Sequence, residues 1–407
     1  MHRRDKDNHR GKPKEPQHLY FDYAASTPID PAVEAAMRPY FRFRFGNPGS
    51  LHRFGQEAIA AVDGAREAIS ASIGARFREL IFTGSATEAN NIVLRGIVRA
   101  WKRKYERTPK LLVSAIEHES ILETAEDLVK DGVEVIRIPV NKEGIVDLAA
   151  LEKLLDEDIS LVSIMYGNNE TGAIEPVQKI GELIRKARAA YASLYPLFHS
   201  DASQAFQFLD CNVERLGVDC MTFSGHKIYG PKGVGALFVR ENTPIDPVLT
   251  GGGQEFSLRS GTENVPLIAG LGKAVGLILE SRSREAERIR VLTRLLWKGI
   301  GQLCPGSKVN GPSIGSKESL PHILNVYFPG KNAQELLTHL DLLGLAVSAG
   351  SACSSRAAEP SYVIRAMGFS EARARSSIRL SLGKYIKKSD VDRALRVITI
   401  VLRSVTK

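Results

Sequence analysis

Asp201 and Lys227 each follow an apolar run of the sequence, and their side chains can do complementary chemistry. A lysine amine forms a Schiff base with an aldehyde, and a carboxylate keeps a pyridine nitrogen protonated so that the ring can accept electrons. Ser224 and His226 flank the lysine and could reach a phosphate group. Lys227 alone would be taken for an ordinary surface lysine beside a capping serine. Together with the motifs that precede them in the chain, these residues predict a site for pyridoxal phosphate.

A turn of small residues, Gly84-Ser85-Ala86-Thr87, separates a short apolar run from a helical pattern. Backbone N–H groups in such a turn can approach an anion closely, and the N-terminus of a helix favours negative charge. The simpler alternative is a well-capped helix with Ser85 or Thr87 as the cap. Because a pyridoxal phosphate lysine is also predicted, we expect the turn to bind the phosphate.

His118 and Asn169 follow two further predicted strands. An imidazole can stack on a pyridine ring and shuttle protons, since its ordinary pKa of about 6.5 suits both directions at neutral pH. An amide can hydrogen-bond the phenolate oxygen of the cofactor. The alternatives are a structural histidine and an ordinary Asn/Gly turn. Both roles therefore depend on the neighbouring motifs.

Seven apolar runs alternate with helical patterns, which predicts a mostly parallel sheet with helices on both faces. In such sheets, ligands bind beyond the carboxyl ends of the strands. Asp201, Lys227, His118 and the turn at 84–87 all follow a strand, so we expect them to converge on one crevice. The runs span residues 80–82, 111–113, 133–140, 161–165, 196–199, 218–223 and 234–239.

The pattern also predicts how the chain divides. Residues 1–17 carry six Lys/Arg against three acids and are expected to be a disordered basic tail. Residues 18–30 are expected to pack with the smaller domain, and residues 31–265 to form the large cofactor-binding domain. A long helical pattern from 266 to about 303 begins a smaller C-terminal α/β domain, which continues to 407 with short strands at 322–328, 345–348 and 377–382.

The composition excludes several classes of protein. No apolar stretch approaches the roughly 20 residues that cross a bilayer, and the start of the chain lacks a hydrophobic signal segment. Four cysteines without a CxxC pair argue against a zinc site or a disulfide framework and predict a cytoplasmic location. The net charge of +9 permits non-specific binding of nucleic acid, but no basic patch with interleaved aromatics or helix-turn-helix pattern supports it.

Six segments together resemble the cysteine desulfurase family, which belongs to the class V branch of fold-type I pyridoxal phosphate enzymes. They occur in the order expected for the family, and the similarity runs from about Leu19 to Lys384. Any one segment is a weak signal, but six in register are specific. They are Asp22-Tyr23-Ala24-Ala25-Ser26-Thr27-Pro28, Phe45-Gly46-Asn47-Pro48, Ala86-Thr87-Glu88, Asn168-Asn169-Glu170-Thr171-Gly172, Ser224-Gly225-His226-Lys227 and Arg259-Ser260-Gly261-Thr262.

The resemblance implies a role for each candidate residue. Lys227 carries the cofactor, Asp201 pairs with its pyridine nitrogen, and His118 stacks on the ring and acts as acid and base. Asn169 also contacts the substrate. The remaining cofactor contacts are Asn169 and Gln204 at the phenolate oxygen, and Ala86, Thr87, Ser224 and His226 at the phosphate, joined there by Thr262 of the partner subunit in a homodimer.

A thiol would distinguish a desulfurase from its aminotransferase relatives. Cys353 lies among four serines and a glycine in residues 348–355, as a mobile sulfur carrier requires. Arg379 matches the family's arginine for the substrate carboxylate, which a guanidinium binds through two hydrogen bonds. The implied reaction converts L-cysteine to L-alanine and leaves a persulfide on Cys353.

The resemblance leaves the partners and the precise substrate open. A selenocysteine lyase or another class V enzyme such as an aminotransferase is the alternative function. The sulfur acceptor would be an iron–sulfur scaffold protein or a tRNA-thiolation enzyme. No resident metal is expected, although Cys353 could contact an iron–sulfur cluster transiently. The chain lacks the C-terminal extension with which housekeeping members dock a scaffold, which leaves the identity of the acceptor protein open but not the chemistry.

Overall fold

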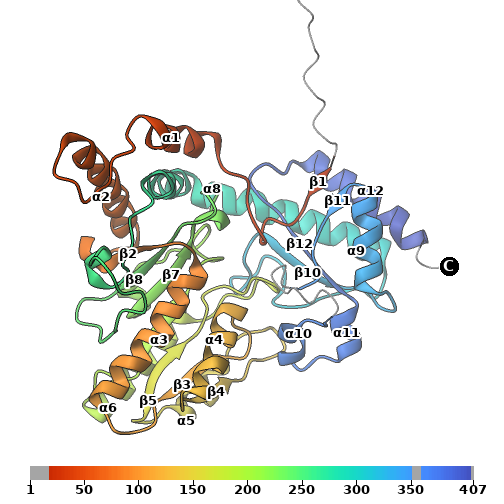
Figure 1. Ribbon diagram of the computed structural model, residues 1–407. Coiled ribbons are helices and arrows are strands. Elements are labelled where there is room, and N and C mark those ends of the chain that lie inside the picture. The colour runs from red at the N-terminus through yellow and green to blue at the C-terminus, as the bar shows by residue number, and fades with distance from the viewer. Residues whose placement is uncertain (1–17, 351–358, 405–407) are drawn as a thin grey trace, which may run out of the picture.

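A seven-stranded sheet forms the centre of the larger part of the protein (Figure 1), in a computed structural model that describes residues 18–350 and 359–404. The strand order is β2-β8-β7-β6-β5-β3-β4, and β8 runs antiparallel to both of its neighbours while the other pairs are parallel. The prediction of a mostly parallel sheet is therefore confirmed. The strands are β2 (Leu80–Thr83), β3 (Lys110–Ser114), β4 (Glu134–Ile138), β5 (Ile159–Ser163), β6 (Leu197–Asp201), β7 (Cys220–Ser224) and β8 (Gly235–Val239).

Helices cover both faces of this sheet because side chains along each strand alternate between the two faces. Phe198 on β6 belongs to one apolar core, whereas its neighbour Leu197 belongs to the other. The first core includes α1 (Pro31–Arg42), α2 (Arg53–Ile73), α5 (Leu148–Leu154), α6 (Val177–Tyr191), α7 (Val213–Leu216) and the start of α8 (Val265–Leu303). The second includes α3 (Ala86–Lys104) and α4 (Glu119–Lys130).

A three-stranded antiparallel sheet of order β12-β10-β9 forms the centre of the smaller part. It packs against α9, α12 and the second half of α8 in a separate apolar core. The elements are β9 (Lys308–Val309), β10 (Ile323–Tyr327), α9 (Ala333–Leu342), α10 (Tyr362–Ala366), α11 (Glu371–Arg375), β12 (Ser377–Ser381) and α12 (Lys388–Ser404). Short 3-10 turns lie at Phe77–Glu79, Gly225–Lys227 and Glu255–Ser257.

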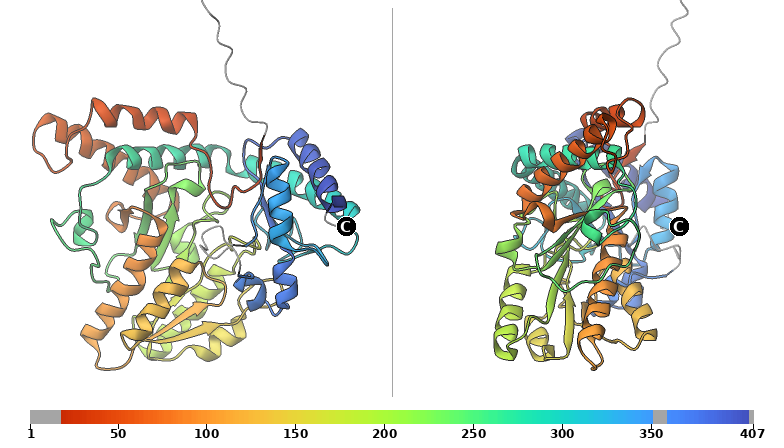
Figure 2. Two further views of the ribbon diagram at one scale, coloured as in Figure 1. Left: turned by 45° about the vertical axis from the view of Figure 1, so that its right-hand side comes forward. Right: turned by 60° about the vertical axis from the view of Figure 1, so that its left-hand side comes forward.

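Two elements connect these parts. The strand β1 (Leu19–Tyr20) pairs with β11 (Leu345–Ala346), so the start of the described chain lies beside its C-terminal third. Helix α8 has 39 residues, and at 1.5 Å per residue it extends about 60 Å. Figure 2 shows it running from beneath α1 to the second sheet, where its later residues enter the second core. The boundary expected at residue 265 falls at the start of α8, and because the first half of this helix packs in the core of the large sheet, we propose that the boundary lies near its middle.

The parallel strands bring several loops to one edge of the large sheet. The turn after β2 leads into α3, the loop after β3 carries His118, and the loop after β5 carries Asn169. Asp201 is the last residue of β6, and Lys227 lies in the 3-10 turn after β7. Within the described residues, none of the helices has the length and apolar character of a membrane span.

Candidate active site

A cavity of about 120 Å³ opens at the carboxyl edge of the large sheet. It brings together the loops after five strands and Arg379 from the second sheet. Ten of the residues singled out in the sequence line it: Ala86, Thr87, His118, Asn169, Asp201, Gln204, Ser224, His226, Lys227 and Arg379.

Lys227 reaches the cavity from the turn that follows β7. Its Nζ donates to the backbone carbonyl oxygens of Ala24 and Ala25, at 2.7 and 2.8 Å. These carbonyls belong to the segment after β1, which therefore forms one wall of the cavity. These two hydrogen bonds fix the position of the amine at the wall of the cavity.

Asp201 presents a carboxylate that is held from both sides. Its Oδ1 accepts from the backbone N–H of Ser203 at 2.9 Å, and its Oδ2 accepts from the Asn90 side chain at 3.0 Å. The residue is 6% exposed and lines the cavity. These two hydrogen bonds fix the orientation of the carboxylate at the cavity wall, where it can pair with the protonated nitrogen of a pyridine ring.

Donor groups converge at the other end of the cavity. Ser85 caps α3 by accepting from the Glu88 N–H at 3.1 Å. Ala86 and Thr87, the first two residues of this 19-residue helix, line the cavity, so the N-terminus of the helix lies at its wall. An ion pair between Glu88 and Arg259 holds this turn, with 2.6 Å between Nε and Oε1. Burial, followed by nearby Lys227 and Lys232, lowers the pKa of His226 to about 4. This end of the site is therefore suited to a phosphate.

Arg379 extends from β12 and is only 1% exposed. Its Nη1 donates to the Asn169 carbonyl and its Nη2 to Asp22 Oδ1, both at 2.7 Å. Its Nε is buried without a hydrogen-bond partner among the described residues. The guanidinium is therefore fixed in orientation and keeps a donor for a further acceptor such as a carboxylate.

One predicted residue does not line this cavity, and another lies outside the described residues. Thr262 is exposed and does not line it. Cys353 lies outside the described residues, as do the flanking residues of its loop and the predicted tail at 1–17. The other three cysteines are poor nucleophiles, since burial raises the pKa of Cys211 to about 12, of Cys220 well above its ordinary value, and of Cys304 more moderately.

Comparisons with known proteins agree with this geometry. The class-V aminotransferase family model matches residues 19–394. A cysteine desulfurase IscS from Dictyoglomus turgidum is 41% identical over 380 residues, covering 93% of each chain. The chain belongs to the cysteine desulfurase family. A NifS-like protein structure superposes with a TM-score of 0.87 at 36% identity, covering 95% of this chain and all of that one. A structure of SspA in complex with cysteine superposes with a TM-score of 0.77 at 34% identity, covering 90% and 99%.

Desulfurases of this class use pyridoxal phosphate, and the residues of the cavity fit that cofactor. The N-terminus of α3 would hold the phosphate, Asp201 the ring nitrogen and Lys227 the aldehyde carbon. The side-chain oxygen of Asn169 is buried and has no hydrogen-bond partner in residues 18–350 and 359–404, and Gln204 donates from Nε2 to the Ala24 carbonyl at 2.8 Å. Both amides line the cavity and are available to the ring substituents.

The sequence analysis missed three residues of this desulfurase site. Asn90 and Ser120 connect Asp201 to His118 through hydrogen bonds, and Asp22 binds Arg379. All three lie inside or beside segments that were recognised, so a signal was present. Their roles depend on where neighbouring helices place the side chains, which the motifs do not state.

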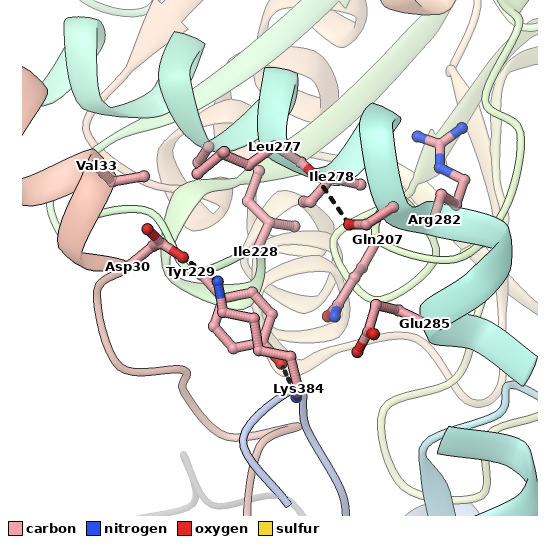
Figure 3. A pocket seen from close by; sticks show the side chains of 12 residues that line it. Asp30, Val33, Gln207, Ile228, Tyr229, Leu277, Ile278, Arg282, Glu285 and Lys384 are labelled. Atoms are coloured by element: carbon pink, nitrogen blue, oxygen red, sulfur yellow. Dashed lines mark hydrogen bonds and ion pairs between the residues drawn. The ribbon is translucent and has the colours of Figure 1, made fainter. Parts of the chain in front are cut away.

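A second, smaller cavity lies behind the turn that carries Lys227 (Figure 3). Lys384 pairs there with Asp30, and its Nζ lies 4.4 Å from the centre of the Tyr229 ring. The backbone N–H of Lys384 donates to the Tyr229 hydroxyl at 2.7 Å. These contacts connect the chain after β12 to a residue two positions beyond Lys227, so in this desulfurase fold they align the two sheets.

Two buried carboxyl groups lie next to the desulfurase site. Glu117 accepts from the Ser114 hydroxyl at 2.5 Å and from the Met165 N–H at 2.7 Å. Glu175 accepts from the Val146 N–H at 2.9 Å, and its Oε1 has no partner in the described part of the chain. Burial raises the pKa of Glu175 to about 8. Near neutral pH this side chain therefore keeps its proton in the folded state.

We expect Glu175→Gln to stabilise the protein relative to wild type as the pH rises from about 4.5 to 8. The pKa of Glu175 is higher in the folded state than in the unfolded state. The stability that wild type gains from this buried side chain is therefore fully present below pH 4.5, and it is lost as the pH rises to about 8. A shift from 4.5 to about 8 corresponds to ~5 kcal/mol. Denaturant unfolding at several pH values measures the difference. The exposed Glu182→Gln on α6 is the control, and parallel profiles for wild type and Glu175→Gln would contradict the assignment.

Proposed function

We propose that the protein removes sulfur from L-cysteine, releases L-alanine and keeps the sulfur as a persulfide on Cys353. The observation that carries this proposal is the convergence of Lys227, Asp201 and Arg379 on one cavity in a chain about 40% identical to cysteine desulfurases. The related SspA structure contains cysteine, which supports this amino acid as substrate. The direct test is to supply L-cysteine with a reductant. Equal amounts of alanine and sulfide are expected, whereas a keto acid product would contradict the proposal.

Each residue of the site has a separate role in the proposed reaction. Arg379 binds the substrate carboxylate through the donor that Asp22 and Asn169 leave available. Bound pyridoxal phosphate supplies an electron sink for negative charge at Cα. Lys227 takes the Cα proton, and Asp201 holds the proton on the ring nitrogen. The Cys353 thiolate attacks the substrate sulfur, so an S–S bond forms as the C–S bond breaks and its electron pair passes to the carbon skeleton. Protonation of that skeleton gives alanine.

The sulfur then passes to an acceptor protein, an iron–sulfur scaffold or a tRNA-thiolation enzyme, within the cytoplasm. The resemblance to the family supports this part of the proposal, together with four cysteines that form no CxxC pair.

A homodimer is also part of the proposed function. An exposed apolar loop between α1 and α2, residues 43–52, supports this part of the proposal. Phe43 is 72% exposed and Phe45 67%, while Leu51 is 93% exposed. Large exposed apolar groups clustered in this way are typical of an interaction surface. A second copy of the chain is the proposed occupant, because Thr262, which the family resemblance assigns to the phosphate of the partner subunit, is exposed and does not line its own subunit's cavity.

We expect Phe43→Glu combined with Phe45→Glu to convert the dimer to a monomer. Burying a phenylalanine contributes about 2 kcal/mol, so two substitutions weaken association by about 10³-fold. Sedimentation velocity at assay concentrations measures the change. Leu342→Glu, at another exposed leucine, is the matched control and should leave the dimer intact. A wild-type protein that is an active monomer would contradict the shared site.

A further inference from the structure

A chain of hydrogen bonds through Asn90 and Ser120 connects Asp201 to His118 in the candidate site. The Nδ2 of Asn90 lies 3.0 Å from Asp201 Oδ2 and 2.8 Å from the Ser120 hydroxyl oxygen. That oxygen lies 2.9 Å from His118 Nδ1. Asn90 is fully buried on α3, and Ser120 is 9% exposed at the start of α4. The chain therefore joins β6, α3 and α4 at the back of the cavity.

The direction of these hydrogen bonds is fixed at Asn90. Asp201 is an acceptor, so the amide must turn its NH₂ group toward it, and the same nitrogen donates its second hydrogen to Ser120. The Ser120 hydroxyl oxygen then accepts from Asn90, which leaves its hydrogen to point at His118 Nδ1. The backbone N–H of Ser120 donates to the same Nδ1 at 3.1 Å. Two donors thus face this ring nitrogen.

A neutral imidazole carries one hydrogen, so two donors at Nδ1 place that hydrogen on Nε2. Within the described residues, Nε2 makes no hydrogen bond, and His118 lines the cavity. We propose that Asn90 and Ser120 are positioning residues that hold His118 as a neutral hydrogen-bond donor through Nε2–H. In the proposed desulfurase reaction, on which this inference rests, His118 would donate to the bound substrate, and Lys227 alone would exchange the Cα proton.

In this arrangement the His118 Nδ1 accepts hydrogen bonds, whereas a histidine beside a carboxylate donates one. A direct carboxylate stabilises the imidazolium cation. Here the Asn90 amide and the Ser120 hydroxyl separate the Asp201 charge from the ring, and the hydroxyl and the backbone N–H of Ser120 present hydrogens to Nδ1. Burial lowers the pKa of His118, with Asp201 opposing the shift and Lys227 adding to it. The neighbouring His226 also interacts electrostatically with His118 and adds no negative charge.

Nitrogen NMR of the holoenzyme labelled with ¹⁵N-histidine tests the inference without turnover. In wild type at neutral pH, His118 should show a protonated Nε2 and an unprotonated Nδ1 that accepts hydrogen bonds. The signal is assigned by its loss in His118→Gln. A protonated Nδ1, or a charged ring, would overturn the proposal. Loss of desulfurase activity alone would not, because the measurement requires no substrate.

Two variants test the positioning residues themselves. Ser120→Ala and Asn90→Ala should each raise the population with a proton at Nδ1, and lower kcat about fivefold, the size expected for one neutral hydrogen bond. Ser120→Thr keeps the hydroxyl and should restore the wild-type spectrum. Asn91→Ala is the control one residue along α3, since Asn91 donates to the Thr87 carbonyl. If Ser120→Ala leaves the His118 nitrogens unchanged, the hydroxyl chain does not set the tautomer and the proposal is wrong.

Discussion

Lys227→Ala is expected to abolish turnover and the visible absorbance of the bound cofactor. The variant loses both the covalent attachment and the group that takes the Cα proton, so kcat should fall by about 10³-fold or more. The donors at the α3 N-terminus and the Asp201 carboxylate are unchanged, so some cofactor should still bind without covalent attachment. Absorbance spectra and borohydride reduction followed by mass spectrometry measure the two effects separately.

The control for this variant is Lys186→Ala, an exposed lysine on α6. It should keep wild-type absorbance and activity. A Lys227→Ala protein that still holds the cofactor through a borohydride-reducible bond would show that another lysine carries it. Partial rescue by added small amines would support the role of Lys227 as the proton-accepting group.

The second large effect is expected at Cys353. Cys353→Ser should bind the cofactor and L-cysteine, because those steps use Lys227, Asp201 and Arg379. It should release no alanine in a single turnover, since a serine hydroxyl near neutral pH is a far poorer nucleophile than a thiolate. Intact-mass spectrometry after mixing with L-cysteine gives the readout: wild type gains one sulfur atom and the variant gains none.

Cys304→Ser provides the matched control, because Cys304 is only partly buried and its thiol has a raised pKa. This variant should acquire the persulfide as wild type does. Alanine formation by Cys353→Ser at the wild-type level would instead favour a lyase that acts without a protein nucleophile. A persulfide on Cys304 in wild type would show that the sulfur acceptor was assigned to the wrong cysteine.

Much of the fold could be predicted because the strands are short, most of them are buried, and helices separate most of them. All seven predicted runs coincide with strands of the large sheet, and the long helical pattern after residue 265 is α8. Convergence of Asp201, Lys227 and His118 followed from strand direction, since parallel strands end at one edge. Arg379 was different. Its motif suggested a role through resemblance, but its position depends on how the second sheet meets the first.

The hydrogen-bond chain behind His118 could not be predicted in the same way. Asn90 and Ser120 occur at the starts of helices, where asparagine and serine commonly cap backbone groups. Sequence spacing gives no sign that the two side chains meet across α3 and α4. Only the packing of these helices against β6 brings them to Asp201 and His118.

Helix α8 has a consequence for substrate binding. Its two halves lie in different apolar cores, and residues 279–285 between them contain neither proline nor glycine, the residues at which helices usually bend. The sheets that carry Asp201 and Arg379 are thus packed against the same continuous helix. We therefore expect the distance between these two residues to be set before any ligand binds. A substrate would then enter a preorganised pocket, and its binding free energy would act on orienting the reacting bonds instead of closing the protein around it.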